Sequence, residues 1–159
     1  MNIPPDPLPL DSSVGGDGPD ADRVYLIVRA RGGLLDGEFV KVPLGATVTL
    51  GRSRRCDFSL KKSARYLLSS GEDRAEIRAR MAFRAVSRRH CSIRFASPSV
   101  VEITNHSSNG TFVDGLAVAS IRLGDIRRMA HELRLGQSGD RFDVAFGSLA
   151  TLPEDSISR

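Results

Sequence analysis

The sequence lacks the features that mark several large classes of protein. No run approaches the roughly 18 uninterrupted apolar residues that a membrane helix needs, and residues 1–13 lack the basic start and apolar run of a secretory signal. We therefore expect a cytoplasmic protein without a membrane segment. Cysteine occurs only at Cys56 and Cys91, each among apolar neighbours, and we expect two buried, reduced thiols in place of a disulfide or a redox pair.

Catalytic, cofactor and metal motifs are missing as well. The chain contains no Gly-x-Gly-x-x-Gly, no phosphate-binding Gly-x-x-x-x-Gly-Lys and no Gly-x-Ser-x-Gly nucleophile elbow. The histidines and cysteines have no zinc-type spacing, so we expect neither a metal nor a cofactor. Tryptophan is absent and tyrosine occurs twice, which leaves few aromatic side chains to stack on bases.

Length and charge suit one basic domain. A chain of 159 residues, of which 40% are hydrophobic, can bury one core but is short for two domains. Residues 1–22 are rich in Pro, Gly, Asp and Ser, and we interpret them as a disordered acidic leader. We place the domain at residues 23–148 and a flexible C-terminal tail at 149–159. After the leader, 23 basic residues stand against 14 acidic ones, which favours anionic partners such as nucleic acid, anionic lipid or phosphorylated protein.

Short β-type runs separated by turn residues dominate from residue 24 onward. The alternation of apolar and polar residues is clearest over residues 91–95, where Cys91, Ile93 and Phe95 face one side of the strand and Ser92 and Arg94 face the other. Asp114-Gly115, between two apolar runs, predicts a two-residue hairpin in which both turn positions take positive φ. Many short strands predict an all-β fold, an antiparallel β-sandwich of about 11 strands. The other predicted strands lie at 24–28, 39–42, 47–50, 57–60, 100–104, 133–135 and 142–146.

Residues 61–84 interrupt this rhythm and form an insert. A capping-box-like start at Ser69 and Ser70, followed by apolar residues at helical spacing, predicts a short helix over about 69–84. The insert is basic, and its arginines either solvate an exposed face or favour acidic residues near a ligand: Arg65, Arg74, Arg78, Arg80 and Arg84.

Three clusters of small polar, Gly or Arg residues lie at predicted strand ends, where a β protein exposes its function. Arginine offers a planar, permanently charged fork for two phosphate oxygens, serine hydroxyls donate to an oxyanion, and glycine lets backbone N–H groups approach closely. Histidine is the only general base among them, so the set is suited to holding a tetrahedral dianion and we do not expect an enzyme. The clusters are Gly51-Arg52, Ser87-Arg88-Arg89-His90 and residues 105–111.

The order of these clusters resembles the signature of the forkhead-associated (FHA) domain family. The matching residues are Gly51-Arg52, then Ser87-Arg88-x-His90, then the run from Ser107 to Gly115, and later Leu123-Gly124-Asp125. The resemblance covers roughly residues 24–147. It implies a β-sandwich that binds phosphothreonine peptides through the loops at one end.

The resemblance also implies roles for individual residues. Arg52 would be the main phosphate partner, and Ser87 and Arg88 would add hydrogen bonds to the phosphate or to adjoining backbone. Ser108 would help enclose the phosphothreonine, and Asn109 would hold the peptide main chain. Four further motif positions would shape the loops in support: Gly51, His90, Gly110 and Thr111.

We therefore predict a phosphothreonine-dependent recognition module or adaptor in Ser/Thr kinase signalling, whose partner is a phosphothreonine-containing protein. Two alternatives use the same sandwich: a basic nucleic-acid-binding module, which the scarcity of aromatics disfavours, and a phosphate-independent interaction module. Two departures from the family pattern bear on the choice. Asn105 stands where the family commonly has Asp, although Asn makes a similar side-chain turn. The insert leads directly into Ser87 and either extends the pocket or covers it.

Overall fold

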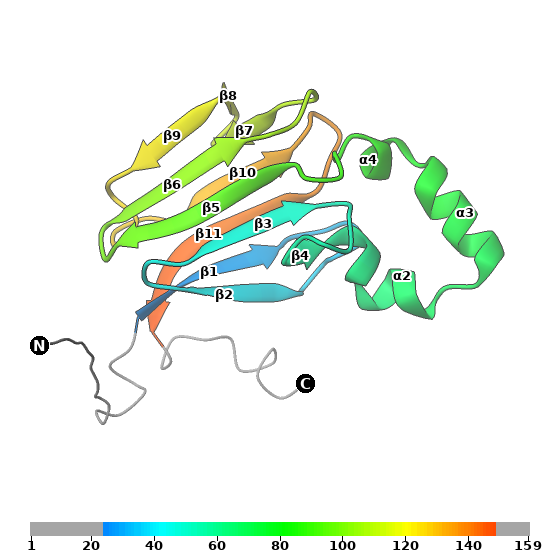
Figure 1. Ribbon diagram of the computed structural model, residues 1–159, viewed down its shortest axis with the longest axis horizontal. Coiled ribbons are helices and arrows are strands. Elements are labelled where there is room, and N and C mark those ends of the chain that lie inside the picture. The colour runs from blue at the N-terminus through cyan, green and yellow to red at the C-terminus, as the bar shows by residue number, and fades with distance from the viewer. Residues whose placement is uncertain (1–23, 149–159) are drawn as a thin grey trace, which may run out of the picture.

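The computed structural model describes residues 24–148, which form two packed sheets with eleven strands in all (Figure 1). The six-stranded sheet has the order β2 (Phe39–Pro43), β1 (Val24–Ala30), β11 (Arg141–Ser148), β10 (His131–Leu135), β7 (Thr111–Val113) and β8 (Leu116–Val118). The five-stranded sheet has the order β4 (Phe58–Ser59), β3 (Thr47–Gly51), β5 (Cys91–Ser97), β6 (Val100–Asn105) and β9 (Ser120–Leu123). The predicted β-sandwich is confirmed, and the predicted leader and tail lie outside the described residues.

Antiparallel pairing joins all neighbouring strands within residues 24–148 except β3 and β4, which pair in parallel over two residues. Strand β9 was not predicted, because it is an edge strand that pairs only with β6 and buries only Leu123. A strand with one neighbour and one buried side chain leaves little alternation in the sequence.

The core lies between the two sheets. The side chains of Ile93 and Phe95 on β5 are fully buried, as the alternation predicts. Phe95 meets Phe146 of β11 edge to face, with ring centroids 6.3 Å apart, so aromatic contacts join the two sheets. Cys56 and Cys91 are both buried and unpaired, which confirms the prediction of buried thiols, and burial raises the pKa of the Cys91 thiol.

The turn between β7 and β8 has the predicted form. Asp114 and Gly115 have φ values of 51° and 86°, and Val113 pairs directly with Leu116. Positive φ at both turn positions matches the twist of the flanking strands, which is why Asp-Gly suits this turn.

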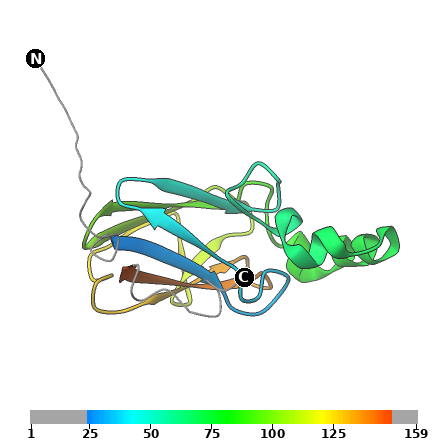
Figure 2. The same ribbon diagram turned by 90° about the horizontal axis from the view of Figure 1, so that it is seen from below.

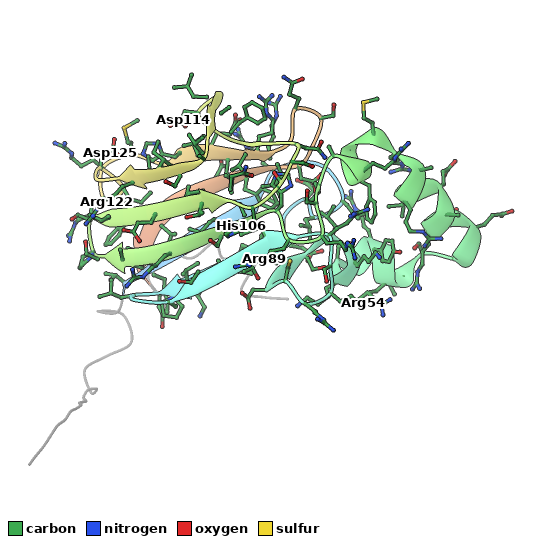
Figure 3. All side chains as sticks on the ribbon, turned by 45° about the horizontal axis from the view of Figure 1, so that its top comes forward. Arg54, Arg89, His106, Asp114, Arg122 and Asp125 are labelled. Atoms are coloured by element: carbon green, nitrogen blue, oxygen red, sulfur yellow. The ribbon has the colours of Figure 1, made fainter. Side chains whose placement is uncertain are left out.

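A buried histidine ties this hairpin to the loop after β9. The two ring nitrogens of His131 lie 2.6 Å from Asp114 Oδ2 and 2.7 Å from Asp125 Oδ1, and Figure 3 labels both aspartates. Only the imidazolium form donates from both nitrogens. Burial alone would lower the pKa of His131, but the two carboxylates outweigh it and raise that pKa.

We expect His131→Gln to lower the free energy of unfolding by about 1 to 2 kcal/mol at pH 6, because a charged hydrogen-bond donor is lost. A raised folded-state pKa gives stabilisation that is complete below the unfolded histidine pKa of about 6.5 and is lost as the pH rises through the higher folded value. The difference between parent and variant should therefore shrink from pH 6 to pH 8.5 in urea titrations. His106→Gln is the control: the pKa of His106 is lowered and not raised, so this substitution should cause no loss of stability that is largest at pH 6. A pH-independent difference for His131→Gln would contradict the prediction.

The predicted helical insert is confirmed and is more finely divided than predicted. It contains a short 3-10 turn η2 (Leu60–Lys62) and the helices α2 (Ala64–Leu68), α3 (Gly71–Ala79) and α4 (Met81–Arg84). Ser70 caps α3, where its hydroxyl accepts the Asp73 N–H at 3.2 Å. Extended backbone at Arg80 (ψ 143°) separates α3 from α4, so the stretch predicted as one helix is two. No helix within residues 24–148 has the length and apolar character to cross a bilayer.

The insert projects beyond one end of the sandwich and leaves the outer faces of both sheets uncovered (Figures 1 and 2). Some of its arginines have structural partners. Arg74 donates to the carbonyls of Tyr66 and Leu67, and Arg78 donates to the Tyr66 hydroxyl at 3.1 Å. Arg65 donates to the Gly33 carbonyl at 3.0 Å. These three arginines therefore hold the insert together and attach it to the sandwich, a role that the sequence did not reveal.

Candidate functional site

The three clusters singled out in the sequence lie in loops at the end of the sandwich that carries the insert (Figure 1). The first cluster ends β3 and begins the loop over residues 52–57. The second leads from α4 into β5, and the third joins β6 to β7. The fold thus brings segments that are about 35 and 20 residues apart in the sequence to one edge.

Backbone hydrogen bonds join the first two loops. The Arg52 N–H donates to the Ser87 carbonyl and the Ser53 N–H donates to the Arg88 carbonyl, both at 3.0 Å. A Cβ on Gly51 would lie 2.3 Å from the Arg88 carbonyl oxygen, so the close approach of the two chains requires glycine. The positions of Arg52 and Ser87 are therefore set relative to each other by main-chain contacts.

His90 joins the second loop to the third. Its ring is fully buried; Nδ1 accepts the Ser87 N–H at 3.0 Å and Nε2 donates to the Gly110 carbonyl at 2.7 Å. Both contacts are satisfied by the neutral tautomer with its proton on Nε2. Burial lowers the pKa of His90, which favours that neutral form. These contacts suit the predicted supporting role of His90, which stays a prediction.

The third loop is shaped by Asn105. Its Oδ1 accepts the Ser107 N–H at 3.1 Å, the Ser107 hydroxyl at 2.6 Å and the Thr111 hydroxyl at 2.7 Å. Asn105 therefore makes the side-chain turn expected where the family commonly has Asp. Gly110 follows with a φ of 93°, and its N–H donates to the Ser107 hydroxyl at 3.0 Å.

The tip of that loop presents two of the predicted binding residues. Ser108 and Asn109 are both exposed. The Asn109 amide donates from Nδ2 to the Ala85 carbonyl at 3.0 Å, so the residue directly after the insert helps to position Asn109. Of the remaining predicted binding residues, Ser87 is half-buried and Arg88 is exposed.

Arg52 rests against the insert. Its guanidinium carbon lies 5.9 Å from the ring centroid of Phe83 in α4, and Phe83 is buried and stacked on Tyr66 with centroids 6.0 Å apart. The Nε of Arg52 is buried and has no hydrogen-bond partner among the described residues. A buried N–H without an acceptor costs about 1 to 3 kcal/mol, more for a charged group. Arg134 Nε on β10 is in the same state.

The insert also lines a hollow that includes Asn109 but none of the other four predicted binding residues. A hollow of about 690 Å³ lies between α4 and the loops that carry Asn109 and the β10–β11 turn. It is lined by Ala79, Met81, Arg84, Ala85, Asn109, Phe112, Gln137 and Ser138. The contributions of Phe83 and Ala85 were missed from the sequence. Helical spacing marked Phe83 as apolar, but no sequence signal placed it beside Arg52.

The fold and the loops together define a sandwich-type binding module, and comparison with known families agrees. Residues 48–130, more than half of the chain, match the family model of the FHA domain. The chain therefore belongs to the FHA domain family. FHA domains are typically phosphothreonine-binding protein-interaction modules, and no catalytic domain is detected.

Solved structures agree on the fold. The FHA domain of an Arabidopsis thaliana hypothetical protein superposes with a TM-score of 0.54 at 18% identity and covers 89% of this chain and 99% of its own. The FHA domain of the CT664 protein from Chlamydia trachomatis gives 0.53 at 18% identity, covering 76% and 96%. An FHA domain studied for phosphothreonine-dependent interactions gives 0.52 at 22% identity, covering 79% and 99%. At these identities the similarity concerns the fold alone. No curated protein matches the chain.

Proposed function

We propose that this chain is a phosphothreonine-dependent recognition module or adaptor that acts in Ser/Thr kinase signalling in the cytoplasm. Its partner is a phosphothreonine-containing protein, and no cofactor takes part. The phosphate and the adjoining peptide are bound by Arg52, Ser87, Arg88, Ser108 and Asn109.

The observation that carries the proposal is the state of Arg52. Its guanidinium is positioned by Phe83 and by the backbone bond to Ser87, yet its buried Nε has no acceptor among the described residues. A phosphothreonine carries about −1.5 to −2 charges at neutral pH and three acceptor oxygens, which supply a counter-charge and acceptors for a guanidinium group. Charge-assisted bonds of this kind are the stronger class of hydrogen bond.

The neighbouring residues suit the rest of such a ligand. Ser87 lies directly across the backbone bond from Arg52, and Ser108 and Asn109 stand exposed on the next loop. The hydroxyls donate to phosphate oxygens, and the Asn109 carboxamide offers both a donor and an acceptor to a peptide main chain. Since the Asn105 turn and His90 hold these loops, little ordering is left for the binding step.

An oriented peptide library tests the proposal. We expect phosphothreonine peptides to bind, their unphosphorylated forms to give no measurable binding, and phosphoserine peptides to bind about fourfold or more weakly, since one buried methyl contributes about 0.8 kcal/mol. Binding should weaken as salt rises. Equal binding of phosphorylated and unphosphorylated peptides would instead identify a phosphate-independent module.

A further inference from the structure

Four arginines crowd the two loops beside Arg52. Arg54 and Arg55 follow it in the first loop, Arg88 and Arg89 lie in the second, and all four are exposed. Within residues 24–148 none of these four makes an ion pair with a carboxylate. Several arginines on or beside the sheets do form ion pairs, by contrast: Arg31 with Glu132 and Asp143, Arg94 and Arg122 with Glu102, and Arg141 with Glu132.

Three of the four surround a depression that we call the arginine hollow. It has a volume of about 320 Å³ and is lined by Thr49, Ser53, Arg55, Cys56, Arg88 and Arg89. No carboxylate is among these lining residues. Asp57, the nearest acid in the sequence, accepts from the Thr49 N–H at 2.9 Å and from the Thr49 hydroxyl at 3.2 Å, so its charge is directed toward β3.

The arginine hollow is held in shape by bonds between its two loops. The Arg88 carbonyl accepts both the Ser53 N–H at 3.0 Å and the Cys56 thiol at 3.1 Å. Within the first loop the Ser53 hydroxyl accepts the Arg55 N–H at 3.2 Å. The backbone that carries the guanidinium groups is therefore fixed before any ligand arrives.

Its position places the arginine hollow next to the proposed phosphate site. Ser53 directly follows Arg52, and Arg88 directly follows Ser87, so the hollow lies close to the two residues proposed to hold the phosphate. Burial and then the charge of Arg89 lower the pKa of His106, so the positive field extends toward the third loop. Figure 3 labels Arg54, Arg89 and His106, with Arg122 at the opposite end of the sandwich.

We propose that the arginine hollow binds a second anionic group of the same phosphorylated partner, either carboxylate side chains beside the phosphothreonine or a second phosphate. This inference rests on the proposed function. Three arginines around a hollow that no carboxylate lines favour a ligand that brings its own negative charge, and the planar guanidinium fork suits both carboxylate and phosphate. Such a ligand is selected by flanking charge in addition to the phosphothreonine.

Fluorescence titration of the full chain with four labelled peptides tests this. One phosphothreonine peptide has neutral flanks, two carry three acidic residues before or after the phosphothreonine, and one carries a second phosphothreonine. The proteins are the parent, Arg55→Gln with Arg89→Gln, and a control that loses the same charge at exposed positions elsewhere, Arg122→Gln with Arg128→Gln. For the parent we expect an acidic flank on one side to lower Kd about tenfold, from two exposed ion pairs.

The double variant at the arginine hollow should lose most of that gain while its Kd for the neutral peptide changes by less than about threefold, and the control should keep the gain. A larger gain from the second phosphate than from the acidic residues would identify that source. No gain in the parent, an unchanged gain in the double variant, or an equal loss in the control would overturn the inference.

One other outcome would overturn the inference, and a further one would overturn the proposed function on which it rests. An oligothymidine that binds through Arg55 and Arg89, while acidic flanks add nothing, would assign the hollow to nucleic acid. Failure of the proposed function differs again, because the neutral phosphopeptide would then bind no better than its unphosphorylated form and Arg52→Ala would change nothing.

Discussion

Arg52→Ala is expected to weaken phosphothreonine-peptide binding by about 2 to 5 kcal/mol, because truncating one member of a desolvated charge pair leaves the other buried without its partner. The substitution removes the planar fork and a permanent positive charge. The loop should keep its course, since Arg52 is held by its backbone N–H bond to Ser87 and Phe83 remains packed on Tyr66. Isothermal titration with one phosphopeptide gives the free-energy difference.

Two further variants separate geometry from charge. Arg52→Lys keeps the charge but loses the fork, and we expect it to recover only part of the affinity. Arg54→Ala removes the same charge from an exposed side chain in the same loop, and we expect a change of less than about 1 kcal/mol. If Arg52→Ala binds as well as the parent, or if Arg54→Ala loses as much, the phosphate site lies elsewhere.

Gly51→Ala is the second substitution with a large expected effect, on both stability and binding. The added Cβ would lie 2.3 Å from the Arg88 carbonyl oxygen and 2.9 Å from Cys56 Sγ. The carbonyl belongs to backbone that also accepts the Ser53 N–H, so it cannot retreat without breaking the contact between the loops. We expect the free energy of unfolding to fall by about 1 to 3 kcal/mol in urea denaturation, as for overpacking elsewhere.

The same displacement should weaken phosphopeptide binding about tenfold or more, because Arg52 and Ser87 stand on the two backbones that are forced apart. Gly71→Ala is the matched control. Nothing lies within 4 Å of a Cβ at Gly71, which begins α3, and alanine is a better helix former there. A Gly51→Ala protein with parental stability and affinity would show that the close approach does not matter.

The insert is the part of the chain that most changes the interpretation of the site. It stands beyond the sandwich end, where Phe83 lies beside Arg52. Directly after the insert, the Ala85 carbonyl holds the Asn109 amide. The insert and the residue that follows it therefore contact two of the five predicted binding residues. Its structural arginines bind to its own backbone, to the Tyr66 hydroxyl or to the β1–β2 loop, which keeps this short helical segment in place.

The features that the sequence by itself determined are local ones. Period-2 alternation predicted the strand that buries Ile93 and Phe95, Asp-Gly predicted the β7–β8 turn, and Ser70 marked the start of α3. Each depends on residues a few positions apart, where backbone preference and side-chain period act directly. The order of the three loop clusters also sufficed to predict the family and the all-β sandwich.

Only the tertiary structure decided how those parts meet. His90 reaches Gly110 across 20 residues, His131 reaches Asp114 across 17, and Phe83 comes to lie beside Arg52. The hollow that includes Asn109 and the ion pairs formed by some arginines but not others were likewise beyond the sequence. Such contacts join segments that are distant along the chain, and they form only when sheet pairing and core packing bring those segments together. No local periodicity or backbone preference records these contacts. The three loop clusters could therefore be recognised as a motif, but their geometry could not be predicted.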